Sequence, residues 1–83
     1  MKVTLKLYAS LGGFLPDGAS RNEASVDIAD GTTIIELLDR YNVPRKSCHL
    51  VLVNGLFQPP AARASVALND GDVLAVWPPI AGG

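Results

Sequence analysis

Asp30-Gly31-Thr32-Thr33-Ile34-Ile35-Glu36-Leu37-Leu38 (residues 30–38) is the stretch that decides the fold, because it marks the end of a strand and the start of a helix. The dipeptide Asp30-Gly31 is typical of turns. Thr33 and Glu36 have the spacing of a capping box, in which each side chain binds the backbone N–H of the other residue. Apolar residues then recur at the helical positions i, i+3, i+4 and i+7, namely Ile34, Leu37, Leu38 and Tyr41. The stretch therefore predicts one main helix over about residues 33–42, which is short and needs a sheet to pack against.

Strand patterns flank this helix on both sides. Residues 2–8 and residues 23–29 alternate apolar and polar side chains, which is typical of half-buried strands. We expect these two strands to pair through a compact connection at residues 9–22 that contains one helical turn. After the helix, the continuous apolar run at residues 50–53 predicts a strand buried on both faces. Asn54-Gly55 closes this run and predicts a tight turn into a short return strand.

Two further cues complete the outline of the fold. Asn42 suits the left-handed residue that commonly follows a helix. Residues 73–77 form the last expected strand, which Pro78-Pro79 ends because proline cannot donate to a sheet. The fold class is therefore α+β, with a mixed sheet of four or five strands and the main helix packed across one face. We expect residues 1–77 to form a single domain and residues 78–83 to form an extended, flexible C-terminal tail.

Composition excludes several classes of protein. The chain has 83 residues and a net charge of −1, with 48% hydrophobic and 18% charged residues, so it can build one small core and has little room for an enclosed catalytic cavity. No basic run indicates a nucleic-acid partner. No apolar run is long enough to cross a membrane, and the first residues lack the apolar core of a signal peptide. One cysteine cannot form an internal disulfide, so we expect a cytoplasmic protein. The charge and the hydropathy together predict that neither nucleic acid nor a membrane is a partner.

The last six residues, Pro78-Pro79-Ile80-Ala81-Gly82-Gly83, have two physical interpretations. The two glycines lack Cβ atoms, so this end of the chain can enter a narrow channel, and the proline pair stiffens the segment before it. On this interpretation the tail presents the Gly83 carboxylate to a partner. The alternative is an ordinary loose terminus, since chain ends are commonly poorly ordered. The residues alone leave both interpretations open.

In order and spacing, several segments of the chain resemble the MoaD/ThiS-like family of ubiquitin-like sulfur carriers, and in particular the small subunit of molybdopterin synthase. These segments are residues 3–9, 30–38, 51–55, 68–73 and 77–83. The closing Pro-Pro-x-Ala-Gly-Gly is more similar to the molybdopterin branch than to the thiamine branch. The resemblance implies a ubiquitin-like β-grasp fold.

The resemblance also implies a carrier of sulfur with no active site of its own, and so not an enzyme. An E1-like adenylyltransferase would use ATP to adenylate the Gly83 carboxylate. A persulfide sulfur, supplied by a sulfurtransferase or cysteine desulfurase, would then displace AMP and leave a thiocarboxylate. Gly82 would give access to the narrow channel. The tether that partner grooves bind would consist of Pro78, Pro79, Ile80 and Ala81. The sulfur acceptor would be a larger synthase subunit in molybdopterin biosynthesis, and no cofactor is expected to bind to the chain itself.

Phe57 and Trp77 are the candidate docking residues on the body of the domain. Aromatic side chains are enriched among the residues that anchor protein interfaces. The alternative is that both side chains pack in the core, where large aromatic residues are also common. Trp77 lies directly before the tail, which favours docking at this position.

Two other groups of residues suggest chemistry that the sequence does not support. Cys48-His49 is not expected to be a nucleophile pair, because adjacent strand residues face opposite sides. One cysteine and one histidine are also too few ligands for a structural zinc site. We therefore expect a buried thiol beside an exposed histidine, and no metal site. Asp70 and Asp72 are expected to be turn residues, since a calcium loop needs more ligands.

The pathway and the acceptor stay open at this stage. Residues 9–22 and 59–63 do not match the well-known molybdopterin subunit. The alternatives are a sulfur carrier for thiamine or sulfur amino-acid synthesis, and a ubiquitin-like modifier joined to lysines through Gly83. A plain β-grasp binding module with an idle Gly-Gly ending is a third interpretation. The acceptor of the activated carboxylate, a sulfur donor or a protein amine, distinguishes the first two.

Overall fold

The capping box predicted from the sequence is present and begins helix α1 (Ile34–Arg40). In the computed structural model, which describes residues 1–79, the Glu36 N–H donates to Thr33 Oγ1 at 3.2 Å. The Thr33 N–H donates to Glu36 Oε1 at 2.9 Å. Thr33 thus caps the helix and is not part of it, so the helix begins one residue later than predicted.

The end of α1 is set by a left-handed residue. Asn42 has a φ of 62°, as its position in the sequence predicted. The Asn42 N–H donates to the Asp39 carbonyl at 3.0 Å, and the Val43 N–H donates to the Leu38 carbonyl at 3.1 Å. This pair of bonds satisfies carbonyl groups that a helix leaves free at its last turn. The helix has seven residues and is shorter than predicted, because its final turn is this closing motif.

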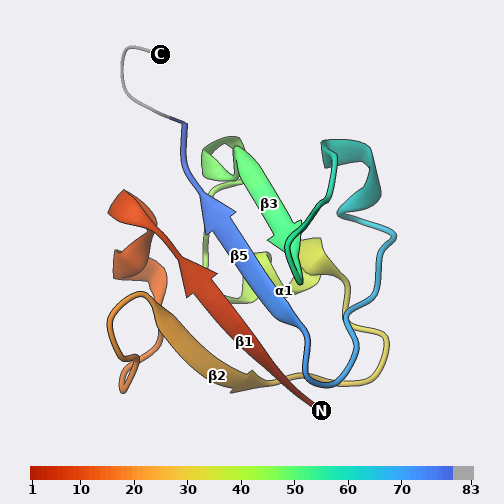
Figure 1. Cartoon of the computed structure of the whole chain (residues 1–83), viewed down its shortest axis with the longest axis horizontal. Coiled ribbons are helices and arrows are strands. Elements are labelled where there is room, and N and C mark those ends of the chain that lie inside the picture. Colours follow the sequence, from red (N-terminus) through yellow and green to blue (C-terminus); the bar gives the residue numbers. More distant parts are fainter. Residues whose placement is uncertain (80–83) are drawn as a thin grey trace.

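The described residues form one five-stranded mixed sheet, in the order β2-β1-β5-β3-β4 (Figure 1). The strands are β1 (Lys2–Leu7), β2 (Glu23–Asp27), β3 (Leu50–Val53), β4 (Leu56–Phe57) and β5 (Val73–Trp77). Strands β1 and β5 are parallel neighbours in the middle, and the other three pairs are antiparallel. Parallel neighbouring strands need a long connection between them. The chain between β1 and β5 includes α1, which lies between the β1–β2 pair and the β3–β4 pair. The predicted mixed sheet and the pairing of the first two strands are confirmed.

The connections contain three short 3-10 segments, Ala9–Phe14, Arg45–Ser47 and Pro60–Ala62. The first of them is the predicted helical turn, and it carries Leu11 into the core, where this side chain is 2% exposed. No helix within residues 1–79 combines the length and the apolar character that a membrane crossing requires.

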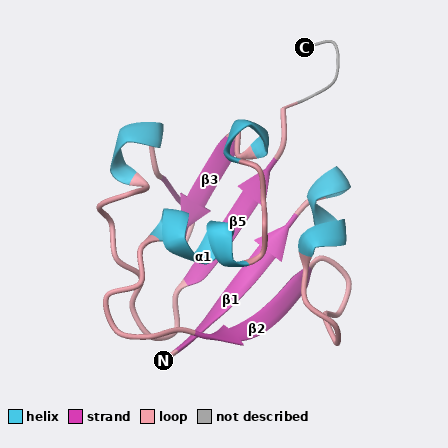
Figure 2. Ribbon diagram, turned by 180° about the vertical axis from the view of Figure 1, so that it is seen from behind, coloured by secondary structure: helices cyan, strands magenta, loops and turns pink. Residues whose placement is uncertain are grey.

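The core lies between α1 and the inner face of the sheet (Figure 2). Leu37 of the helix is fully buried, as are Leu5 and Val76 on the two central strands. The alternation predicted for residues 2–8 is therefore confirmed, with every second side chain buried. The buried cluster comprises Val3, Leu5, Leu7, Leu11, Val26, Ile28, Ile34, Leu37, Leu38, Val43, Cys48, Val51, Leu68, Leu74 and Val76.

The prediction that β3 is buried on both faces is wrong. Val51 is fully buried, whereas Leu50 is 37% exposed and Leu52 is half-buried. Helix α1 covers one face of the sheet, and Figure 1 shows that no element of residues 1–79 covers the other face. The continuous apolar run therefore reflects an uncovered face that carries apolar side chains, which is relevant to the candidate site.

Candidate functional site

The face of the sheet opposite α1 carries a row of apolar side chains. The register pairs Leu50 with Trp77 and pairs Leu52 with Phe57. Alternate residues of a strand face opposite sides, so these side chains lie on the side away from the helix. Tyr8 directly follows β1, and by the same alternation its side chain also lies on the side away from the helix. We call this surface the outer patch. It consists of Tyr8, Leu50, Leu52, Phe57 and Trp77.

Trp77 stacks on Tyr8 at the end of the sheet. The two ring centroids are 4.1 Å apart, and the ring planes are within 3° of parallel. The Tyr8 N–H donates to the Val76 carbonyl at 3.1 Å, which fixes the backbone beneath the pair. Trp77 is half-buried and is not part of the core cluster. Tyr8 was not predicted to be a site residue, although the alternating pattern of residues 2–8 places its side chain on the same side as those of Lys2, Thr4 and Lys6.

Phe57 lies near the other edge of the outer patch and is 49% exposed, so it does not pack in the core. Leu56, its neighbour on β4, is 70% exposed and faces the helix side of the sheet edge. Exposed apolar side chains that gather on one face of a protein are a common feature of interaction surfaces. The structure brings Phe57 and Trp77 to one face, and their docking role stays a prediction.

The candidate tail begins directly after the Trp77 end of the outer patch. Pro78 is half-buried and Pro79 is exposed. The other candidate residues of the tail, Ile80, Ala81, Gly82 and Gly83, lie outside the described residues. The predicted boundary between a domain at 1–77 and a tail at 78–83 therefore stays a prediction.

Cys48 and His49 do not form a nucleophile pair. Cys48 is 5% exposed, and its thiol donates to the Pro44 carbonyl at 3.4 Å, while His49 is exposed. Burial raises the pKa of the Cys48 thiol, and the nearby Arg63 guanidinium offsets only part of this effect. The thiolate form is the nucleophile, so the site disfavours the reactive species at neutral pH. The expected buried thiol beside an exposed histidine is confirmed.

We predict that iodoacetamide alkylates Cys48 slowly at neutral pH in the folded chain, because the thiol is buried and its pKa is raised. The rate is measured by mass spectrometry and compared with that of the chain in urea. Alkylation at equal rates in both states would contradict the assignment.

Arg63 is a buried charge that sequence reasoning missed. It is 5% exposed, and its guanidinium donates to the carbonyls of Gln58 at 3.0 Å, Cys48 at 2.7 Å and His49 at 3.4 Å. No carboxylate of the described residues lies within ion-pair distance of it. Arg63 lies in a loop with no periodic pattern, so no local signal marks it as buried.

A cavity of about 220 Å³ lies beside Arg63, on the helix side of the molecule. Its lining is formed by Ile35, Arg45, Cys48, Pro60, Arg63 and Ala64. This volume is below that of common small-molecule sites, which begin at about 300 Å³. Within residues 1–79 there is no group of three or more histidine, cysteine or acidic residues that could hold a metal ion.

Asp70 and Asp72 hold the turn before β5, as predicted. Asp72 Oδ2 accepts from the Asn69 N–H at 2.7 Å, and Asp72 Oδ1 accepts from Asn54 Nδ2 at 2.9 Å. Asp70 Oδ1 accepts from the Lys2 N–H at 2.8 Å. These carboxylates satisfy backbone and amide donors and link the two turns at this end of the sheet.

Comparison with models of protein families assigns the chain to one family. The model of the ThiS family matches residues 16–83. The chain belongs to the ThiS family. This confirms the resemblance to the ubiquitin-like sulfur carriers that the order of segments predicted. The match includes the tail and most of the domain, and it leaves out β1 and the first half of the connection that follows it.

Solved structures show the same fold for this ThiS-family chain. The crystal structure of SAMP1 from Haloferax volcanii matches with a TM-score of 0.68 and 23% identity, over 100% of both chains. A chain from the complex of subunits 1 and 2 of molybdopterin-converting factor from Helicobacter pylori matches with a TM-score of 0.58 and 16% identity, again over 100% of both chains. At these identities the likeness shows the fold alone. A comparison with curated proteins returned no match.

Proposed function

We propose that the chain is a sulfur carrier whose Gly83 carboxylate is activated and then loaded with sulfur. The carboxylate oxygen attacks the α-phosphorus of ATP in an E1-like partner, which releases pyrophosphate and leaves an acyl-adenylate. A persulfide sulfur then displaces AMP, and cleavage of the S–S bond by a thiol leaves the thiocarboxylate. The chain supplies the carried group and a docking surface, and the partners supply the catalytic machinery.

The single observation that carries this proposal is the position of the outer patch in a ThiS-family chain. The patch ends at Trp77, and the next residues are the Pro-Pro-Ile-Ala-Gly-Gly sequence. A partner that covers Trp77 and Tyr8 would therefore receive the tail at the edge of the same interface. Aromatic anchors beside a tether that ends in two glycines fit a partner with an apolar groove that leads into a narrow channel.

We further propose molybdopterin biosynthesis as the pathway, with a larger synthase subunit as the sulfur acceptor. The Pro-Pro-x-Ala-Gly-Gly ending supports this choice, as does the likeness to a chain of the molybdopterin-converting factor complex. The family match favours a thiamine-type carrier as the second candidate. Incubation of the thiocarboxylated chain with each purified acceptor distinguishes the two, because sulfur is lost from the chain in one mixture only.

The activation step is tested by ATP–pyrophosphate exchange with the E1-like enzyme of the same organism. We expect exchange that depends on the chain and saturates with its concentration. The adenylate should then accept sulfur when a persulfide donor is added, with a thiocarboxylate on Gly83 as the product. Exchange that is unaffected by the chain would contradict the proposed function.

We predict that Phe57→Ser weakens binding of the chain to its synthase or activating partner about tenfold to a hundredfold, because truncation of a buried interface anchor costs roughly 1–3 kcal/mol. Leu56→Ser is the matched control. It changes an exposed apolar residue of the same short strand whose side chain faces the other side of the sheet. Binding is measured by calorimetry, and equal affinity losses in the two variants would argue against the outer patch as the interface.

A further inference from the structure

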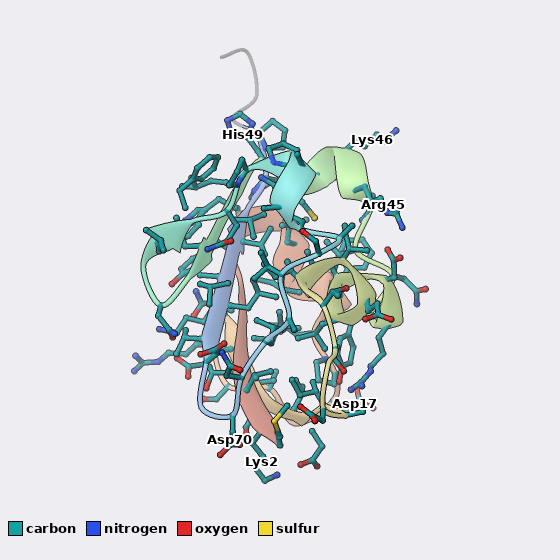
Figure 3. All side chains as sticks on the ribbon, turned by 90° about the vertical axis from the view of Figure 1, so that its right-hand side faces the viewer. Lys2, Asp17, Arg45, Lys46, His49 and Asp70 are labelled. Carbon is teal, nitrogen blue, oxygen red and sulfur yellow. The ribbon has the colours of Figure 1, made fainter. Side chains whose placement is uncertain are left out.

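Two consecutive residues at the start of β3 face Trp77, the last residue of β5. The register pairs Leu50 with Trp77, and the His49 N–H also donates to the Trp77 carbonyl at 3.0 Å. Two residues against one is the arrangement of a β-bulge, which ends or redirects strand pairing and is common beside functional sites. In Figure 3 His49 lies at the end of the molecule opposite Lys2. The bulge therefore lies where β5 ends and the tail begins.

Arg63 holds the backbone of this bulge from inside the molecule. Its guanidinium donates to the Cys48 carbonyl at 2.7 Å and to the His49 carbonyl at 3.4 Å, and the side chain is only 5% exposed. A third bond, to the Gln58 carbonyl at 3.0 Å, fixes the guanidinium itself. A bulge interrupts the hydrogen bonds of the ladder, and buried carbonyl groups need a partner from elsewhere. The planar fork of an arginine side chain serves several carbonyls at once.

One peptide group links Arg63 to Trp77. The Cys48 carbonyl and the His49 N–H belong to the same planar unit. Arg63 binds the oxygen of this unit, and the unit donates its N–H to the Trp77 carbonyl. A cation at the oxygen polarises the peptide group and strengthens the bond that its N–H makes. The Trp77 carbonyl is therefore held by Arg63 through a single rigid peptide group.

The direction of the chain after Trp77 follows from that bond. The Trp77 carbonyl shares its plane with the Pro78 nitrogen, so a fixed carbonyl also fixes where Pro78 starts. The ring of Pro78 fixes the next torsion, φ, and Pro79 restricts the torsion that follows. The Trp77 side chain is held as well, because it stacks on Tyr8 with the ring centroids 4.1 Å apart. The root of the tail is thus oriented by the body of the domain.

We propose that Arg63 is a positioning residue that fixes the direction in which the tail leaves the domain. This inference rests on the proposed function, in which the tail enters a partner channel, and it names a residue that sets the geometry of that step. Arg63 acts through the Cys48–His49 peptide group and Trp77. A tail whose root is already oriented loses less conformational freedom on binding. Arg63 should therefore affect how tightly the tail is bound and leave the rate of the chemical step unchanged.

Amide hydrogen exchange, followed by NMR, tests this role in the chain without a partner. Arg63→Met removes all three donated bonds and keeps an unbranched side chain. The His49 N–H reports the bond to Trp77. The Tyr8 N–H is the control amide, because it donates to the Val76 carbonyl at 3.1 Å, on the β1 side of β5. A general loss of stability accelerates exchange at both amides, so the quantity compared is the ratio of the His49 rate to the Tyr8 rate.

We expect Arg63→Met to raise this ratio at least about tenfold, because bonds to a charged group are lost on the His49 side only. Leu37→Ala is the control variant, since it weakens the core and leaves the bonds of Arg63 in place, and it should change the ratio less than about twofold. Arg63→Lys keeps the charge and is measured in case Arg63→Met does not fold. It should also raise the ratio, because one ammonium group does not match the geometry of three carbonyls. An unchanged ratio in the Arg63 variants would overturn the inference, since Arg63 would then contribute only to overall stability.

Pyrophosphate exchange with the E1-like enzyme of the proposed function gives a second readout. We expect Arg63→Met to raise the KM for the chain about tenfold and to leave kcat within about twofold, because about one backbone residue must then be ordered on binding. Leu37→Ala should leave both constants unchanged at temperatures where it is folded. An unchanged KM in Arg63→Met would overturn the role of Arg63 in presenting the tail. Absence of exchange with the natural chain would refute the proposed function, whereas the amide ratio decides without any partner whether Arg63 holds the root of the tail.

Discussion

Deletion of Gly82 and Gly83 abolishes activation of the chain, and pyrophosphate exchange is expected to fall at least about a hundredfold, which corresponds to about 2.7 kcal/mol. The proposed reaction takes place at the Gly83 carboxylate, and a shortened tail places its new carboxylate short of the ATP site. The fold should not change, because every residue of the core cluster lies between Val3 and Val76. Thermal unfolding should therefore occur within about 2 °C of the natural chain, a shift that corresponds to well under 1 kcal/mol.

Gly83→Ala is the control for this deletion. It keeps the carboxylate at the same distance along the chain and adds one Cβ atom. We expect an intermediate loss of exchange, about tenfold, because a Cβ limits the backbone conformations that a narrow channel can accept. Full exchange by the chain that lacks Gly82 and Gly83 would show that the tail is idle, and would favour a β-grasp module that binds through its sheet.

Leu37→Ala is expected to lower the free energy of unfolding by about 3 kcal/mol, within the range of fully buried leucines. Leu37 is fully buried on α1, and the helix has seven residues, so its stability depends on this packing. A domain of this length has about 4–12 kcal/mol of stability in total, at roughly 0.05–0.15 kcal/mol per residue. The loss is therefore a large part of the whole. Urea unfolding followed by circular dichroism measures it.

Leu56→Ala is the matched control for this stability prediction. It makes the same chemical change at a side chain that is 70% exposed, and we expect a loss below about 0.5 kcal/mol. Equal losses at the two positions would mean that α1 is not packed against the sheet as described.

Elements that follow local rules could be predicted from the sequence. The capping box at Thr33 and Glu36 needs only four consecutive residues, and the left-handed Asn42 needs only the helix end beside it. The alternation of residues 2–8 directly reflects a strand with one covered face. These features depend on neighbours in the chain, so sequence reasoning found them, with errors of one or two residues at the ends of the helix.

Features that depend on distant residues could not be predicted in the same way. Whether Leu50 is covered depends on which elements pack on each face of the sheet, and the run of apolar residues at 50–53 is compatible with either arrangement. The burial of Arg63 depends on carbonyl groups from two other segments of the chain. Tyr8 became part of the candidate site only through its stacking on Trp77, which lies 69 positions later in the chain.

The candidate site was found in part by the same reasoning. Phe57 and Trp77 were chosen for their chemical type, and the register of β3 then brought them to one face. Their shared surface required the pairing of strands that are far apart in the sequence. The roles of Gly82 and Gly83 rest on the resemblance and the family, so they need a direct chemical test.

The central claim is that Gly83 carries sulfur, and the intact mass of the protein tests it most directly. The protein is isolated gently from its own cells, without alkylating or oxidising reagents, and its mass is measured before and after hydrolysis. We predict a species heavier by one sulfur-for-oxygen exchange, which fragmentation assigns to Gly83 and hydrolysis removes. A free carboxylate in every preparation, together with Gly83 found in isopeptide linkage to lysines of other proteins, would contradict the carrier function and identify a protein modifier.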